Sequence, residues 1–441
     1  MYYTFMNKNT PIARVESQYD GASIRVVSIV NPEYAPFVFD MTNNETASSS
    51  MYHWWNGRKI PASRELLSQN LKNLGLKPNE DTSELLIRAY GLSLSDQYWL
   101  CPEGSGLTWK DVNFFDNPFS DDIGEALFDN IAFENASFVS PDSSLGGGLK
   151  KKWKIIDGDR FLVKSGTRFF PLEPFTEVFA NRVCEVLSIE NYLKYELQNG
   201  SYMGSPDPVS ICKCFVDPNT ELVPAYDIIY SPMGKKFPYT LSGDLSYNKF
   251  VNIAEALGVS NIRKALSDTF VLDLVLNNHD RHYNNFGLIR DVNSLKFIGV
   301  APIFDNGYGM YAKSNFYRID EIEESSELYA SYPIPCQKLI EQKPYIKFSD
   351  YPAIEQLSAL KNDFFKLYMS YNIFKEEDIS KLWSRFEVRL ETVRGFCREY
   401  SKMTIPHKLD NIVADVQKRH GTQQNTSIPD KNRNGSGDDA R

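Results

Sequence analysis

The chain has 441 residues, of which 48 are basic and 57 acidic, so its formal charge is −9; 42% of its residues are apolar and 13% aromatic. At roughly 100–200 residues per domain, this length suggests about two to four domains with sizeable cores. The acidic balance excludes non-specific coating of nucleic acid and anchoring to an anionic membrane, because both depend on clustered Lys and Arg.

The beginning of the chain has neither the basic start nor the apolar stretch of a signal peptide, and no segment of about 18 apolar residues occurs. Six cysteines are scattered without C-x-x-C spacing, and only five histidines are present. We therefore expect buried thiols rather than a disulfide framework or a His/Cys metal cluster. The sequence predicts a cytoplasmic protein with no membrane partner.

Residues 1–125 predict a mixed α/β module of unknown role. Short alternating apolar runs over residues 1–40 favour strands, the polar segment Thr42–Ser50 favours a loop, and Leu at helical spacing favours helices between residues 61 and 91. The aromatic-rich segment Gln97–Phe119 is expected to pack against the next domain, since so many aromatic rings are costly to leave in water.

The rest of the chain divides into three further parts. Residues 126–240 predict a strand-rich region with a hairpin around Asp157-Gly158, a helix over residues 174–189 and strands over residues 210–216 and 221–230. Residues 241–415 are mainly helical, with strong helices over residues 261–276, 351–371 and 376–400. Residues 416–441 contain almost no apolar side chain and predict a disordered tail.

The densest group of polar residues, Asn277 to Gly287, follows the apolar helix that ends at Leu276. Asn285 comes five residues after Asp280, and the catalytic loop of protein kinases has the same spacing between an Asp that accepts the hydroxyl proton and an Asn that binds magnesium. Taken alone, a group of this composition is more often a capped helix end with Asx-turns.

A second loop strengthens the first interpretation. Twenty residues after Asn285, an apolar strand end delivers Asp305 into the turn Asp305-Asn306-Gly307. Such a turn on its own indicates only a β-turn, but Asn285 and Asp305 together supply the oxygen ligands that a magnesium ion on a triphosphate requires. The order and the distance of the two loops therefore predict a metal site.

A lysine and a glutamate upstream fit the same site. Lys164 lies in the second strand of the predicted hairpin, and Glu177 lies near the start of the following amphipathic helix, where it could pair with Lys164. The alternatives are a solvated edge lysine and a glutamate favoured by the helix dipole.

A Gly-rich segment precedes the hairpin. Gly146, Gly147 and Gly148 stand between Ser143-Ser144 and a run of lysines that includes Lys151. Glycines let backbone N–H groups approach phosphate, although the segment lacks the Walker pattern. A flexible linker is the alternative.

These motifs resemble the HipA-like family of bacterial serine/threonine kinases over about residues 130–410. The family signature N-x-D-x-H-x-x-N-F is met by Asn278, Asp280, His282, Asn285 and Phe286. The resemblance implies an α+β, bilobal, protein-kinase-like fold with a strand-rich N-lobe and a helical C-lobe, to which residues 1–125 are an addition. It does not cover that N-terminal module.

The resemblance also implies an activity, which is ATP- and Mg²⁺-dependent phosphorylation of a protein. Lys164, Glu177, Gly146 to Gly148 and Lys151 would bind ATP, Asn285 and Asp305 the metal, and Asp280 the acceptor hydroxyl, with His282 bracing the loop. Ser144, or Ser143 beside it, matches the serine that family members can autophosphorylate. A toxin role with a DNA-binding antitoxin would bring DNA contact only through that partner. Open alternatives are a small-molecule or lipid kinase, an AMP transferase and a pseudokinase.

Overall fold

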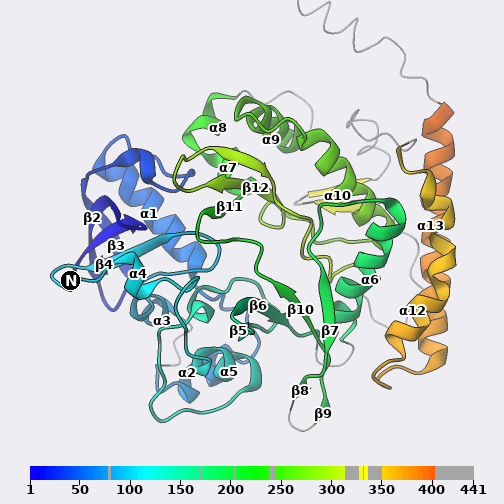
Figure 1. The fold of residues 1–441 in the computed structure, drawn as a ribbon, viewed down its shortest axis with the longest axis horizontal. Helices are drawn as coiled ribbons and strands as arrows, with labels where there is room; N and C mark the ends of the chain where they lie inside the picture. Colours follow the sequence, from blue (N-terminus) through cyan, green and yellow to red (C-terminus); the bar gives the residue numbers. More distant parts are fainter. Residues whose placement is uncertain are drawn as a thin grey trace, which may run out of the picture.

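The computed structural model describes residues 1–77, 81–167, 171–202, 205–237, 245–312, 327–330, 332–335 and 350–402. Helices and antiparallel sheets alternate along the chain, which confirms the predicted α+β class (Figure 1). In the part of the chain that is described, no helix combines the length and the apolar character needed to cross a bilayer. The predicted disordered tail, residues 416–441, lies outside the described residues.

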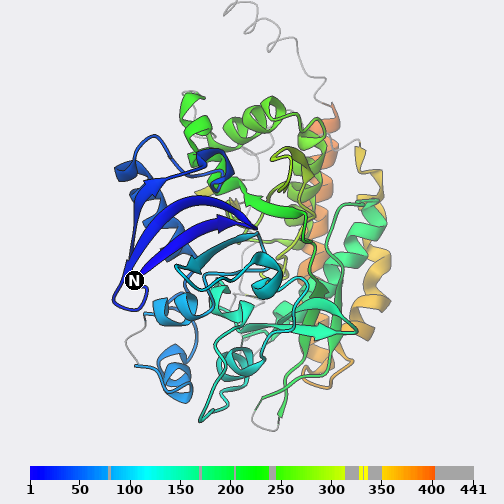
Figure 2. The same ribbon diagram turned by 60° about the vertical axis from the view of Figure 1, so that its left-hand side comes forward.

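The N-terminal module is a curved four-stranded sheet of order β3-β2-β1-β4 with helices around it (Figure 2). Side chains alternate between the two faces of β1, and Tyr3 and Phe5 lie on the buried face. The predicted strands within residues 1–40 are therefore confirmed. The elements are β1 Tyr2–Asn7, β2 Thr10–Gln18, β3 Ser23–Ile29, η1 Pro32–Tyr34, α1 Asn44–Arg58, α2 Leu67–Asn73, α3 Ser83–Arg88, β4 Tyr98–Pro102, α4 Trp109–Val112, α5 Asp122–Asp129 and η2 Pro141–Ser144.

The prediction of a loop over Thr42–Ser50 is wrong, because α1 begins at Asn44. The Asn43 side chain accepts hydrogen bonds from the backbone N–H groups of Glu45 (2.9 Å) and Thr46 (3.0 Å), and the Thr46 hydroxyl accepts one from the Asn43 backbone N–H (3.3 Å), which completes a capping box. Once the helix is nucleated, its buried face of Ala47, Met51 and Trp55 packs on the sheet. Tertiary burial thus outweighs the weak helix propensity of the Ser/Thr-rich start.

A second four-stranded sheet, of order β5-β6-β10-β7, carries the predicted hairpin. Asp157 (φ 51°) and Gly158 (φ 85°) form its two-residue turn, and two positive φ values are what a type I′ hairpin turn requires. The predicted helix after it is also confirmed. The elements are β5 Lys151–Ile156, β6 Asp159–Lys164, α6 Leu172–Leu187, β7 Tyr195–Gln198, β8 Ser201–Tyr202, β9 Ser205–Pro206 and β10 Val209–Lys213.

The remaining part is mainly helical and includes a three-stranded sheet of order β11-β12-β13. The strand predicted over residues 221–230 is half correct: β11 ends at Pro224, and a short helix follows in which Ile228 and Ile229 are buried. The elements are β11 Thr220–Pro224, α7 Ala225–Tyr230, α8 Pro232–Lys236, α9 Leu245–Ala256, α10 Ile262–Leu276, β12 Gly287–Asp291, β13 Phe297–Val300, β14 Glu327–Ala330, β15 Tyr332–Pro335, η5 Pro352–Leu360, α12 Lys361–Tyr368 and α13 Glu376–Lys402.

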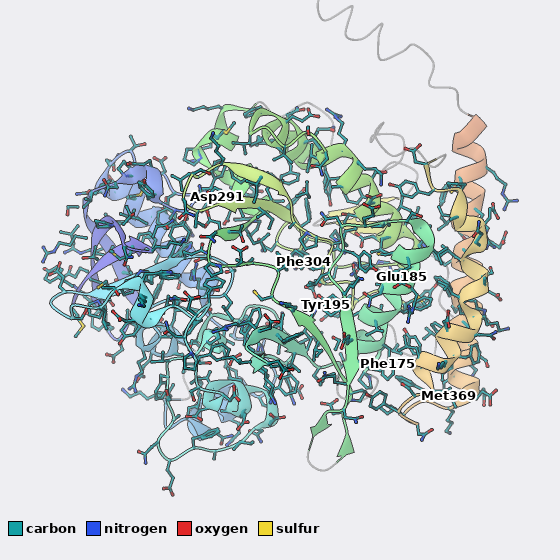
Figure 3. All side chains as sticks on the ribbon, in the orientation of Figure 1. Phe175, Glu185, Tyr195, Asp291, Phe304 and Met369 are labelled. Atoms are coloured by element: carbon teal, nitrogen blue, oxygen red, sulfur yellow. The ribbon has the colours of Figure 1, made fainter. Side chains whose placement is uncertain are left out.

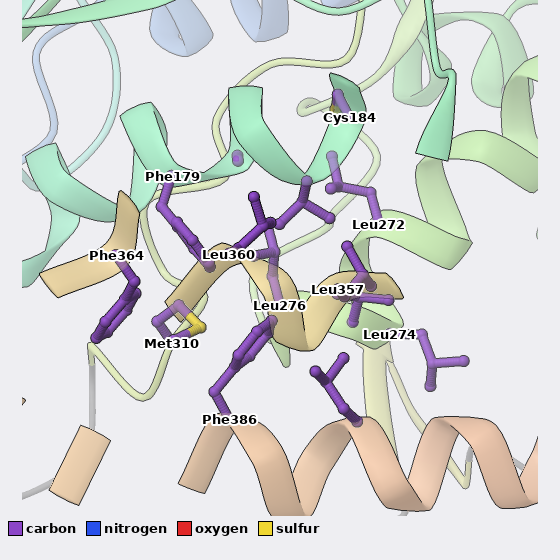
Figure 4. Close-up of a cluster of buried hydrophobic side chains, with 14 of the residues drawn as sticks. Phe179, Cys184, Leu272, Leu274, Leu276, Met310, Leu357, Leu360, Phe364 and Phe386 are labelled. Atoms are coloured by element: carbon purple, nitrogen blue, oxygen red, sulfur yellow. The ribbon is translucent and has the colours of Figure 1, made fainter. Parts of the chain in front are cut away.

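Two apolar clusters fix the position of the site. In the first, α6 packs against α10, η5, α12 and α13 through side chains that include Phe179, Leu276 and Phe386 (Figure 4). In the second, Trp99, Trp109 and other aromatic residues of the segment Gln97–Phe119 pack with Val216, which confirms that this segment does not swing free. Helix α5 runs across the position predicted for the boundary between residues 125 and 126.

Candidate active site

Lys164, Glu177 and Asp305 meet in one buried ionic cluster, which we name the cleft cluster. Lys164 Nζ forms an ion pair with Glu177 Oε1 and lies 2.5 Å from Asp305 Oδ1. Lys164 is the last residue of β6, Glu177 lies in α6, and Asp305 follows the β12–β13 hairpin. Three segments far apart in the sequence therefore deliver one side chain each to the same point.

Burial and mutual attraction act against each other in the cleft cluster. Burial lowers the pKa of Lys164, but the carboxylates of Asp305 and Glu177 outweigh that effect and raise this pKa well above its usual value. Burial raises the pKa of Asp305, but the ammonium groups of Lys164 and Lys151 outweigh it and hold this pKa well below its usual range. Burial raises the pKa of Glu177, and Lys164 offsets only part of that shift. Of the two acids, Asp305 is therefore more firmly ionised than Glu177.

Tyr195 contacts two members of the cleft cluster. It was not identified from the sequence. Its hydroxyl accepts a hydrogen bond from the Asp305 backbone N–H (3.3 Å), and its ring centroid lies 5.2 Å from Lys164 Nζ. A short parallel bridge between Tyr192 and Ile303 brings the two segments together, and Figure 3 shows Tyr195 and Phe304 near the centre of the molecule. Only pairing between distant segments reveals this contact.

The loop after α10 is held by its own polar groups. Asn277 ends the helix in the left-handed conformation (φ 54°), and Asn278 Oδ1 accepts a hydrogen bond from the Asp280 backbone N–H (3.2 Å). Asn285 Nδ2 donates to the Asp280 carbonyl (2.9 Å). The two residues that the sequence singled out, Asp280 and Asn285, are therefore neighbours across one loop.

His282 lies within this loop, half-buried. Its Nδ1 accepts a hydrogen bond from the Asn284 backbone N–H (3.3 Å), and the backbone N–H of His282 donates to the Asp280 carbonyl (2.9 Å). These contacts are local to the loop and suit the bracing role that the family resemblance implies.

Arg281 joins the two functional loops and was missed by sequence reasoning. It is 1% exposed and pairs with Asp273 of α10, with 3.0 Å between Nη2 and Oδ1. Its guanidinium also donates to the Asn285 carbonyl (2.9 Å), to the Phe304 carbonyl and to Asn306 Oδ1 (2.6 Å). One side chain therefore fixes the loop of Asp280 relative to the loop of Asp305.

The Gly-rich segment lies between η2 and β5 with its three glycines exposed. Before it, Ser143 is fully buried, whereas Ser144 is half-buried and donates to the Pro141 carbonyl (3.1 Å). Burial lowers the pKa of Lys151 to about 8, as do the charges of Lys164 and Arg64, while Asp305 opposes the shift. Lys151 therefore lies within electrostatic reach of the cleft cluster.

Glu173 is a further buried acid, one helical turn before Glu177 in α6. Its Oε2 accepts a hydrogen bond from the Thr167 backbone N–H (3.0 Å), while its buried Oε1 has no hydrogen-bond partner among the described residues. Burial raises its pKa to about 7. The spacing of Glu173 and Glu177 was a signal in the sequence, since residues four apart share a helix face.

The donor set suits a hard divalent cation. Asp305 Oδ2 and Asn285 Oδ1 form no hydrogen bond with any described residue, and both are oxygen ligands of the type that magnesium prefers. Among the residues described, no group of three or more His, Cys, Asp or Glu side chains is arranged to bind a metal. Two protein ligands are enough where phosphate and water complete the shell.

Comparisons with known proteins give little further information. No protein-family model matches the chain, and no curated protein matches it. Among solved structures, the chain is similar to the crystal structure of a Helicobacter pylori proinflammatory kinase, CtkA, with a TM-score of 0.40 and 18% sequence identity over 57% of this chain and 95% of that chain. The resemblance to the HipA-like family therefore depends on the residues themselves.

Proposed function

We propose that this protein is an ATP- and Mg²⁺-dependent serine/threonine kinase of the HipA-like type. The observation that carries the proposal is the cleft cluster, in which Lys164 bridges a helix glutamate and an aspartate at the end of a hairpin. In this arrangement the sheet β5-β6-β10-β7 with α6 acts as the N-lobe, and the helices from α7 onward act as the C-lobe.

The roles follow from the groups present. Lys164, oriented by Glu177, contacts the phosphates, and Asn285 and Asp305 hold the metal. When bound, magnesium neutralises charge that develops on the phosphate oxygens. The acceptor hydroxyl oxygen attacks the γ-phosphorus, the bond from that phosphorus to the β–γ bridging oxygen breaks, and the hydroxyl proton passes to the Asp280 carboxylate. Positioning and charge stabilisation supply most of the catalysis.

The acceptor is proposed from the resemblance alone. A protein serine or threonine fits the family, and so does a toxin held by an antitoxin. Within the chain, Ser144 is the better candidate for autophosphorylation, because Ser143 is fully buried and Ser144 is only half-buried.

The test is intact-mass measurement and phosphopeptide mapping after incubation with Mg²⁺ and ATP. We would compare wild type with Asp280→Ala, Asp305→Ala and Asp291→Ala, the last being a half-buried aspartate at the end of β12, outside the site. We expect one phosphate, about 80 Da, on wild type and Asp291→Ala only. Persistent activity in a folded Asp305→Ala variant would refute the kinase assignment, and a gain of the mass of AMP would change the reaction to nucleotide transfer.

If no mass is gained, we would measure ATP turnover with candidate protein, lipid and sugar acceptors. This measurement separates a kinase that acts only on other molecules from a pseudokinase. Turnover lost in Asp305→Ala but kept in Asp291→Ala supports a kinase that acts only on other molecules. Binding of ATP without turnover indicates a pseudokinase.

A further inference from the structure

One side chain of the N-terminal module, that of Arg64, forms several hydrogen bonds with the Gly-rich segment. Arg64, between α1 and α2, is 2% exposed. Its Nε donates to the Gly147 carbonyl (2.9 Å), and its Nη2 donates to the carbonyls of Leu145 (2.7 Å) and Gly146 (3.1 Å). Three successive carbonyls thus converge on a single guanidinium, which requires the segment to curl around it.

Little else holds this segment. A Cβ atom placed on Gly146 or Gly148 would meet no atom within 4 Å, so side-chain packing does not set their position. A cavity of about 490 Å³ borders Gly146 and Gly147 on the side of the N-terminal module, between them and residues such as Lys59 and Asp81. The segment has room to move, and the hydrogen bonds from Arg64 oppose that movement.

Within the described part of the chain, no ion pair neutralises the charge of Arg64. No carboxylate of the described residues forms a salt bridge with it, and Asp142, the acid whose charge favours it most, is itself fully buried with a pKa raised by burial to about 7. Arg64 Nη1 is buried and has no hydrogen-bond partner among the residues that the structure describes. A buried, unpaired cation is costly, so its position needs a compensating role.

A second cation lies on the same segment. A Cβ on Gly147 would come within 2.8 Å of Lys151 Nζ, and Gly147 has a φ of +87°. The positive charge of Arg64 helps to lower the pKa of Lys151. Two cations, Arg64 and Lys151, therefore lie against the segment, and they favour a polyphosphate over a neutral ligand.

We propose that Arg64 is a positioning residue that holds the Gly-rich segment in the conformation that receives the phosphates of ATP. This inference rests on the function proposed above. It makes the N-terminal module, which lies outside the family resemblance, a working part of the nucleotide site.

The competing explanation is that Arg64 only fastens two parts of the chain together. Arg58 provides the matched control, because it is also a buried arginine of the N-terminal module. It pairs with Asp96, donates to the Gly91 carbonyl (3.0 Å) and covers the Trp54 ring at 4.0 Å, and none of these groups belongs to the Gly-rich segment.

The experiment is calorimetric titration of the full chain with Mg²⁺–ATP and, separately, with adenosine. The proteins are wild type, Arg64→Met, Arg64→Lys and Arg58→Met, each with its thermal midpoint recorded. We expect Arg64→Met to weaken ATP binding about tenfold to a hundredfold, because hydrogen bonds from a charged donor are lost, and to leave adenosine binding unchanged. Arg64→Lys should recover part of the loss. Arg58→Met should lower the midpoint without this selective effect.

The outcomes separate the two proposals. If wild type binds no Mg²⁺–ATP, the proposed function fails. If wild type binds and Arg64→Met binds equally well, or loses ATP and adenosine affinity alike, the role of Arg64 is overturned. Should Arg64→Met not fold, Gly147→Ala keeps Arg64 and strains the segment at its positive φ; this variant must then lose ATP affinity selectively, and unchanged ATP affinity would reject the proposal.

Discussion

Two buried ionic clusters of similar size occupy different places in this protein. The cleft cluster joins Lys164, Glu177 and Asp305, whereas a second group, the junction cluster, joins Arg290 of β12, Glu221 of β11 and Tyr98 of β4. In the junction cluster, Arg290 forms an ion pair with Glu221 and donates to the Tyr98 hydroxyl (2.6 Å). It links the N-terminal module to the sheet β11-β12-β13.

The two clusters differ in charge and in access. The junction cluster pairs one cation with one carboxylate, and the side chains of Arg290 and Glu221 are only 4% and 2% exposed. The cleft cluster sets one lysine against two carboxylates, and the side chain of Asp305 is 31% exposed. Burial of charge is therefore common to both, and only the cleft cluster has a surplus negative charge that a cation from solvent can reach.

The largest effect is expected from breaking the junction cluster. Arg290→Met leaves Glu221 buried without its partner, so we expect the free energy of unfolding to fall by about 3–5 kcal/mol. Urea unfolding measures this, and Mg²⁺–ATP binding at a temperature where the variant is folded should stay at the wild-type level. The exposed Arg14, which pairs with Glu103, is the control, and its replacement by Met should change stability little. Weakened ATP binding in folded Arg290→Met would show that the two clusters are not separate in role.

Breaking the cleft cluster should affect activity first. Lys164→Met removes the phosphate contact, and we expect ATP turnover to fall about 10²–10³-fold, as when other preorganised electrostatic groups are removed. Lys213→Met, which replaces an exposed lysine at the end of the neighbouring strand β10, should leave turnover unchanged. Equal turnover in the two variants would contradict the assignment.

Glu173, a buried acid beside the cleft cluster in α6, should make the stability of the protein depend on pH. Because its folded-state pKa is raised to about 7 from 4.5, the folded protein binds more protons than the unfolded chain between these values, and stability falls as pH rises through this window. We expect Glu173→Gln to gain about 3 kcal/mol of unfolding free energy at pH 8 and almost nothing near pH 4. The pKa of Asp142 is also raised to about 7, so the stability of the Glu173→Gln variant should still fall with rising pH, although less steeply. A gain independent of pH would show that Glu173 is ionised throughout.

The smallest effect is expected at Tyr195. Tyr195→Phe leaves the Asp305 backbone N–H without its acceptor, and we expect a loss of about 1 kcal/mol in stability. Chemical unfolding of this variant beside Tyr192→Phe, a half-buried tyrosine in the same segment, measures the difference. Equal losses would mean that the hydroxyl of Tyr195 does not support the Asp305 loop.

Sequence reasoning reached the residues that are recognisable by order and spacing. Lys164 and Asp305 stand at strand ends and Glu177 at a helix start, so local patterns locate them, and the structure brings these three together. Arg64 escaped notice because its partners are backbone carbonyls, which carry no side-chain signal in a sequence. Arg281 escaped notice because its partners lie in α10, in its own loop and in the Asp305 loop, which only the fold brings together. The same limit applies to the fold: the hairpin and α10 follow from turn residues and periodicity, whereas α1 depends on burial against a sheet.

The hydrogen bonds of Arg281 predict which positions should vary together among related sequences. Its guanidinium donates hydrogen bonds to Asp273, to two backbone carbonyls and to Asn306 at once. Only a planar group with several nitrogens can donate in all of these directions. A lysine offers one nitrogen and cannot replace it. Positions 273, 281 and 306 should therefore drift together among relatives of this chain, and a lineage that has lost one of the three should have lost the others.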